Sequence, residues 1–182
     1  PETRAQWQRL KSHAQSRIHA SAVPIHASDI AFRMVDFARR NAERAGVAQV
    51  IEFHGGDALE RPAPVLPDDL PGTLILNPPY GERIDVAGKG RAPAPSGHDN
   101  KSAPPDFFAR LATHWKRAYS QHPAGWTAWV LSPDMKLPGA MRMKESRRVP
   151  MWNGPIECRL YRFELRPLPA QDRDADGAKA SA

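Results

Sequence analysis

The residues Asn77-Pro78-Pro79-Tyr80 follow the apolar run Leu74-Ile75-Leu76 directly. Two consecutive prolines fix φ and remove two N–H donors, which leaves rigid main-chain carbonyls as acceptors. The side-chain carbonyl of Asn77 and the main-chain carbonyl of Pro78 can together accept both hydrogens of one –NH2 group. Tyr80 offers a flat ring on which a base can stack. These four residues therefore predict an acceptor site for an amino group on an aromatic ring.

Such a site suits methylation of an exocyclic amine. The lone pair of this amine is delocalised into the ring, and two hydrogen bonds to acceptors push the nitrogen toward tetrahedral geometry. The lone pair then points at a methyl group on a sulfonium donor, so the protein contributes orientation and electrostatics. The target base must be unpaired or flipped, because a stacked amine is out of reach. The alternative interpretation is a stiff turn that ends a strand.

Hydrophobic periodicity predicts the elements that position this tetrapeptide. The expected helices cover residues 4–19, a segment that begins at Ser28-Asp29 and ends at Gly46, and residues 105–122. The expected strands cover residues 24–28, 50–53, 73–76, 127–131, 147–152 and 157–165. Alternation of strands and helices predicts an α/β fold, in which ligands bind beyond the carboxyl ends of the strands.

Composition narrows the class of protein. The chain has 182 residues, a formal net charge of +6 and one cysteine, and its seven histidines show no Cys/His spacing typical of a metal site. We expect one domain over residues 1–166, a surface loop at 86–105 and a disordered tail at 167–182. No apolar run is long enough to span a bilayer, so we expect a cytoplasmic protein. The spacing of histidine and cysteine leads us to expect no metal. The positive charge favours a polyanionic partner only weakly.

The string "NPPYGERI", with "SDIAFRMVDFARRNAERAGV" before it and "NGPIECRLYRF" after it, resembles a known family. This is the class I S-adenosylmethionine-dependent methyltransferases that modify exocyclic amines, and among them the RlmL-like 23S rRNA guanine-N2 methyltransferases. The likeness covers roughly residues 7–165. It implies a Rossmann-like sheet that is mostly parallel, with one antiparallel strand near the C-terminus.

The resemblance also implies roles for single residues in binding S-adenosylmethionine. Asp29 would bind the ribose hydroxyls and Ile30 would pack on the adenine. Asp57 would accept a hydrogen bond from the adenine amino group, and Ala58 would donate one through its backbone. Asn77 would contribute to cofactor binding as well as to catalysis. The alternatives are that Asp29 caps a helix and that Asp57 is a turn residue.

Roles near the substrate follow from the same resemblance. Asn77, Pro78 and Tyr80 would be catalytic, and Pro79, Tyr80 and Arg83 would contact the substrate. Arg83 could instead pair with a neighbouring carboxylate.

The chain departs from the family pattern in two ways. Ala31 stands where the family usually has a second acidic residue. The glycine-rich motif I and the first strand would lie upstream of Trp7, as would an RNA-binding THUMP domain, so we expect the chain to be a C-terminal catalytic piece.

The expected function is methylation of guanine N2 in large-subunit ribosomal RNA. A DNA adenine-N6 methyltransferase is the first alternative, because both reactions target an aromatic –NH2 group. Protein glutamine methylation comes third. A non-catalytic RNA-binding module is the alternative from another class of protein.

Overall fold

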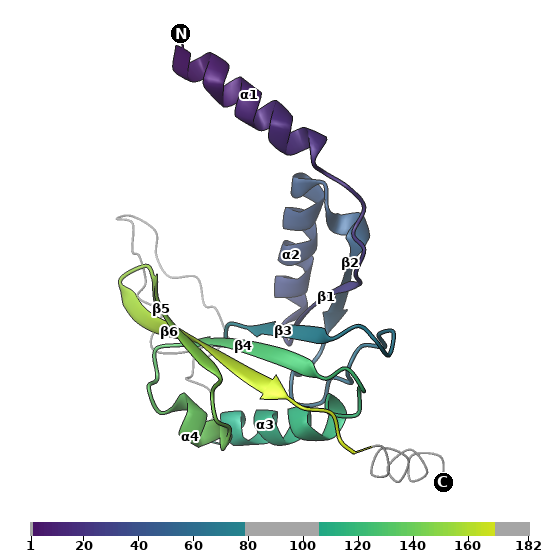
Figure 1. The fold of residues 1–182 in the computed structure, drawn as a ribbon, viewed down its shortest axis with the longest axis vertical. Helices are drawn as coiled ribbons and strands as arrows, with labels where there is room; N and C mark the ends of the chain where they lie inside the picture. Colours follow the sequence, from purple (N-terminus) through teal and green to yellow (C-terminus); the bar gives the residue numbers. More distant parts are fainter. Residues whose placement is uncertain (1, 79–105, 170–182) are drawn as a thin grey trace. The chain divides into compact units, whose positions relative to one another are not determined.

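A computed structural model describes residues 2–78 and 106–169, and Figure 1 shows its ribbon. The chain divides into two compact units, Pro1–Ala58 and Leu59–Ala182. The single domain over residues 1–166 therefore stays a prediction. The loop at 86–105 and most of the tail at 167–182 lie outside the described residues. Among the described residues, none of the helices is long and apolar enough to cross a membrane.

The first unit is built on a pair of parallel strands. Its elements are α1 (Glu2–Ser16), β1 (Ile25–Asp29), α2 (Phe32–Ala45), the 3-10 helix η1 (Ala48–Val50) and β2 (Ile51–Gly55). β1 and β2 pair in register from Ile25 opposite Ile51 to Asp29 opposite Gly55. α2 contacts both strands, as the helix of a β-α-β unit does.

The two ends of α2 test the sequence predictions separately. Gly46 has φ of 73° and closes the helix in the left-handed conformation, with its N–H directed at the carbonyls of Ala42 and Glu43. The C-terminal prediction is thus confirmed. The expected N-cap at Ser28-Asp29 is wrong, because the cap residue is Ala31, which has no capping side chain.

The first unit buries very little of its apolar surface. Ala42 is its one buried residue among those whose burial the structure describes. In α1, the apolar residues Trp7 and Leu10 are both exposed, at 61% and 59%. The helix predicted for this segment is confirmed, but its apolar side packs against no other element among the described residues.

The second unit is a four-stranded sheet. Its elements are β3 (Gly72–Leu76), α3 (Phe107–Ala118), β4 (Trp126–Ser132), α4 (Leu137–Met141), β5 (Arg147–Asn153) and β6 (Ile156–Leu165). The strand order is β3-β4-β6-β5. β3 and β4 are parallel, and β6 runs antiparallel to both β4 and β5. β6 is the one antiparallel strand that the sequence predicted near the C-terminus.

The core of the second unit lies where α3 and α4 pack beneath this sheet (Figure 1). Tyr161 and Phe163 lie two positions apart on β6, so they share one face of the strand, and both are completely buried. The Tyr161 hydroxyl donates a hydrogen bond to the carbonyl of Asp134 at 3.1 Å. Burial raises the pKa of Tyr161, which keeps this hydroxyl protonated as a donor.

Two histidines fix the proline-rich connection that leads into β3. His114 Nε2 lies 2.7 Å from the carbonyl of Arg61, and His122 Nε2 lies 2.8 Å from the carbonyl of Leu70. Because His114 lies in α3 and His122 shortly after it, the helix region holds both ends of the connection. The position of β3 thus depends on α3 as well as on pairing with β4.

We predict that Gly72→Ala destabilises the sheet by about 1–3 kcal/mol, because the added methyl has no room. A Cβ at Gly72 would lie 2.1 Å from the ring of Trp126, whereas a Cβ at Gly139 in α4 would meet nothing within 4 Å. Gly139→Ala is therefore the matched control and should be neutral or slightly stabilising. Urea denaturation followed by tryptophan fluorescence measures both, and equal midpoints would contradict the prediction.

Candidate active site

Asp29 ends β1 at the carboxyl edge of the two-stranded sheet and is exposed. Its Oδ1 accepts a hydrogen bond from the Ala31 N–H at 2.8 Å, and its main-chain carbonyl accepts one from the Gly56 N–H at 3.0 Å. Among the described residues, Oδ2 has no hydrogen-bond partner. One carboxylate oxygen therefore holds the local backbone, and the other remains available to a ligand.

An exposed apolar surface lies beside this carboxylate. Ile30 is 68% exposed and Phe32 is 78% exposed. The ring of Phe32 lies against Gly55, where a Cβ would come within 2.4 Å of it. Gly55 therefore lets the ring approach the end of β2 closely. The sequence analysis missed Phe32, although an aromatic residue two positions after Ile30 and a Gly-Gly pair after the next strand were visible signals.

Asp57 and Ala58 follow β2 and are both half-buried. The hydrogen bond from Gly56 to Asp29 joins the segment after β2 to the segment after β1. The structure thus brings four of the predicted cofactor residues to one edge of the first unit: Asp29, Ile30, Asp57 and Ala58.

Asn77 and Pro78 belong to the second unit and follow β3 directly. Asn77 is exposed, whereas Pro78 is buried. The buried proline anchors the chain, while the amide of Asn77 stays accessible to a ligand. Pro79, Tyr80 and Arg83 lie outside the described residues, so their roles stay predictions from the sequence.

The matching family model covers residues 1–94, just over half of the chain, and is UPF0020, described as RMKL-like, methyltransferase domain. The chain belongs to this family. The matched segment contains all the candidate residues at both strand ends, from Asp29 to Arg83. The family resemblance given by the sequence motifs is confirmed.

Two curated relatives are named Ribosomal RNA large subunit methyltransferase K/L. The protein from Psychromonas ingrahamii is 33% identical over 88% of this chain, and the alignment covers 19% of that protein. The protein from Shewanella baltica is 31% identical over 89% of this chain and 20% of that protein. The chain therefore spans about a fifth of the length of these relatives.

A solved structure supports the fold. SMU.472, described as a candidate methyltransferase and complexed with SAH, aligns with a TM-score of 0.63 and 21% identity over 90% of this chain and 37% of that one. This likeness and the strand directions agree with the predicted Rossmann-like, class I methyltransferase fold.

The two oxygens of Asp29 can be tested apart. We predict that Asp29→Ala destabilises the start of α2 by about 1 kcal/mol, because the acceptor for the Ala31 N–H is lost. Asp29→Asn keeps a side-chain oxygen and should leave that stability within about 0.5 kcal/mol. Hydrogen exchange of the Ala31 amide is the measurement. Equal exchange in the two variants would contradict the assignment of Oδ1 as the local acceptor.

Proposed function

We propose that this chain is the catalytic part of an S-adenosylmethionine-dependent methyltransferase acting on guanine N2 of large-subunit ribosomal RNA. The observation that carries the proposal is the exposed amide of Asn77 next to a buried Pro78, immediately after a strand of a methyltransferase-family chain. The names of the two curated relatives support ribosomal RNA as the substrate. A bacterial ribosomal substrate also implies a cytoplasmic location.

The carboxyl edge of the first unit fits S-adenosylmethionine. The available Oδ2 of Asp29 is an acceptor for the ribose hydroxyls, and a carboxylate accepts such hydrogen bonds more strongly than a neutral oxygen does. Ile30 and Phe32 provide exposed apolar surface for the adenine ring. Asp57 then accepts a hydrogen bond from the adenine amino group, and the Ala58 N–H donates one to the adenine ring. When bound, S-adenosylmethionine supplies an electrophilic methyl group on a sulfonium.

Asn77 and Pro78 bind the second reactant, the guanine base of the RNA. The Oδ1 of Asn77 and the carbonyl of Pro78 accept the two hydrogens of the guanine amino group, and Tyr80 stacks on the base. The amine nitrogen forms a bond to the methyl carbon as the carbon–sulfur bond breaks, and that electron pair goes to sulfur. The extra proton on nitrogen leaves to water. Catalysis by these residues is orientation plus electrostatics, without a strong base.

The charge of the chain fits an RNA substrate. With a net charge of +6, the chain attracts a polyanion, and its binding to RNA should weaken as salt rises. Arg83, next to the acceptor residues in the sequence, is a candidate phosphate contact.

We predict that Asn77→Ala in the full-length protein lowers kcat by about 10²–10³-fold, because one acceptor for the amine is lost. The matched control is Asn41→Ala, which removes an exposed asparagine from α2. Nucleoside mass spectrometry of ribosomal RNA after reaction measures the product. N2-methylguanosine that forms equally in both variants would overturn the role of Asn77, and N6-methyladenine in DNA as the sole product would overturn the substrate assignment.

We predict that Asp29→Asn weakens S-adenosylhomocysteine binding about 10–100-fold, because the charge-assisted hydrogen bonds to the ribose are lost. The start of α2 should remain intact in this variant, so the loss would report on the ligand rather than on folding. Isothermal titration calorimetry gives the dissociation constant, with Asp68→Asn in an exposed stretch as the control. Equal affinities in the two variants would remove Asp29 from the site.

A further inference from the structure

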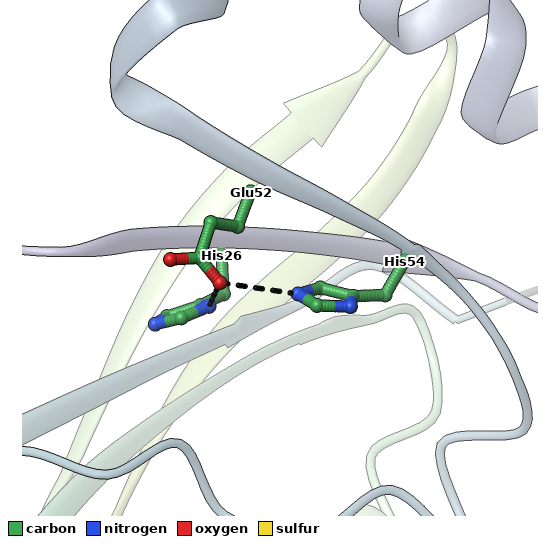
Figure 2. Close-up of side chains that lie close together, drawn as sticks. All are labelled: His26, Glu52 and His54. Atoms are coloured by element: carbon green, nitrogen blue, oxygen red, sulfur yellow. Dashed lines mark ion pairs between the residues drawn. The ribbon is translucent and has the colours of Figure 1, made fainter.

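Three side chains that the methyltransferase site does not use converge on one face of the two-stranded sheet. His26 lies on β1, and Glu52 and His54 lie on β2. His26 is the register partner of Glu52, and His54 follows two residues later on the same strand. Figure 2 shows both imidazole rings directed at the Glu52 carboxylate.

This face lies opposite α2. The alternate residues Ala27 and Phe53 line a hollow together with Met34 and Ala38 of α2. Because successive side chains of a strand point to opposite faces, His26, Glu52 and His54 point away from that helix. His26 also lies three positions before Asp29, so the cluster is separate from the proposed cofactor edge.

The distances within the cluster are those of metal ligands. Glu52 Oε2 lies 3.3 Å from His26 Nδ1 and 3.5 Å from His54 Nε2. Two ligands bound tetrahedrally at 2.0–2.1 Å from one zinc ion lie about 3.3 Å apart. Each residue offers a ligand atom, and all three atoms lie within 4.8 Å of one another. Two of the three ligand-to-ligand distances therefore match those of a tetrahedral zinc site, and the third lies within 4.8 Å.

The imidazole nitrogens lack other partners. The buried Nδ1 of His26 and Nε2 of His54 face the Glu52 carboxylate and have no hydrogen bond to any other described residue. The Nε2 of His26 is buried and has no partner at all among the described residues. A buried polar atom without a partner costs roughly 1–3 kcal/mol. The Glu52 side chain is 68% exposed, so an ion can reach the cluster from solvent.

We propose that His26, Glu52 and His54 bind one divalent cation of the zinc class. Two imidazoles and one carboxylate suit zinc rather than magnesium or calcium, which prefer oxygen ligands. The fourth position would hold water. Bound to both strands, the ion joins β1 to β2 on the face that α2 does not cover, in a unit with one buried residue among those described.

The sequence analysis predicted no metal, because it considered only spacing along the chain. Glu52 and His54 are two residues apart on one strand, which was a visible signal for a shared face. The third ligand comes from the neighbouring strand and depends on the register of pairing.

The proposal is tested by cobalt binding to the full-length protein after removal of metals with a chelator. We expect one equivalent of Co²⁺ to bind with the intense visible absorption of four-coordinate cobalt, and Zn²⁺ to displace it. His54→Gln should weaken the binding at least tenfold. The matched control, His13→Gln in exposed α1, should bind as the unchanged protein does.

A second measurement separates metal binding from folding. Zn²⁺ should raise the Tm of the unchanged protein and of His13→Gln but not that of His54→Gln or of Glu52→Gln, with circular dichroism confirming that each variant is folded. Absence of saturable Co²⁺ binding to the folded protein, or equal affinity in His54→Gln and His13→Gln, would overturn the proposal. These readouts do not use methyl transfer and are independent of the proposed activity.

Discussion

The parallel register that sets Ile25 opposite Ile51 is the constraint on which most of the first unit depends. It places Asp29 beside Gly55 at the carboxyl edge, where the turn after β2 donates a hydrogen bond back to β1. A shift of one residue would turn every side chain of a strand to the other face. It would therefore disrupt the carboxylate edge and the His26–Glu52 pair at the same time.

The elements that could be predicted from sequence are those whose signals are local. A continuous apolar run predicted β4, and Gly46 predicted the end of α2. The short helix α4 was missed because its five residues include Pro138 and Gly139, which are typical of turns. The cap of α2 was misplaced because the Asp29 side chain bonds to the backbone two residues later and so imitates a capping residue.

The candidate site shows the same difference between residues with local sequence signals and residues whose position depends on the fold. Asn77 and Pro78 were proposed because their chemistry lies in consecutive residues, and Asp29 and Asp57 were proposed through a family resemblance; the roles of all four stay predictions. Phe32 was missed despite the visible sequence signals, because its closeness to Gly55 depends on how the chain turns between β1 and α2. Contacts between strands require the register, which no spacing along the chain reveals.

Cys158 can report on local opening of the sheet in the second unit. The residue lies in β6, between β4 and β5 in the sheet, and is completely buried. It is the only cysteine in the sequence, so any thiol reagent that modifies this chain must reach it there. Under native conditions the rate of modification then measures how often the sheet opens at its antiparallel strand. The rate of Cys158 modification therefore reports the local opening of β6, the antiparallel strand of this sheet.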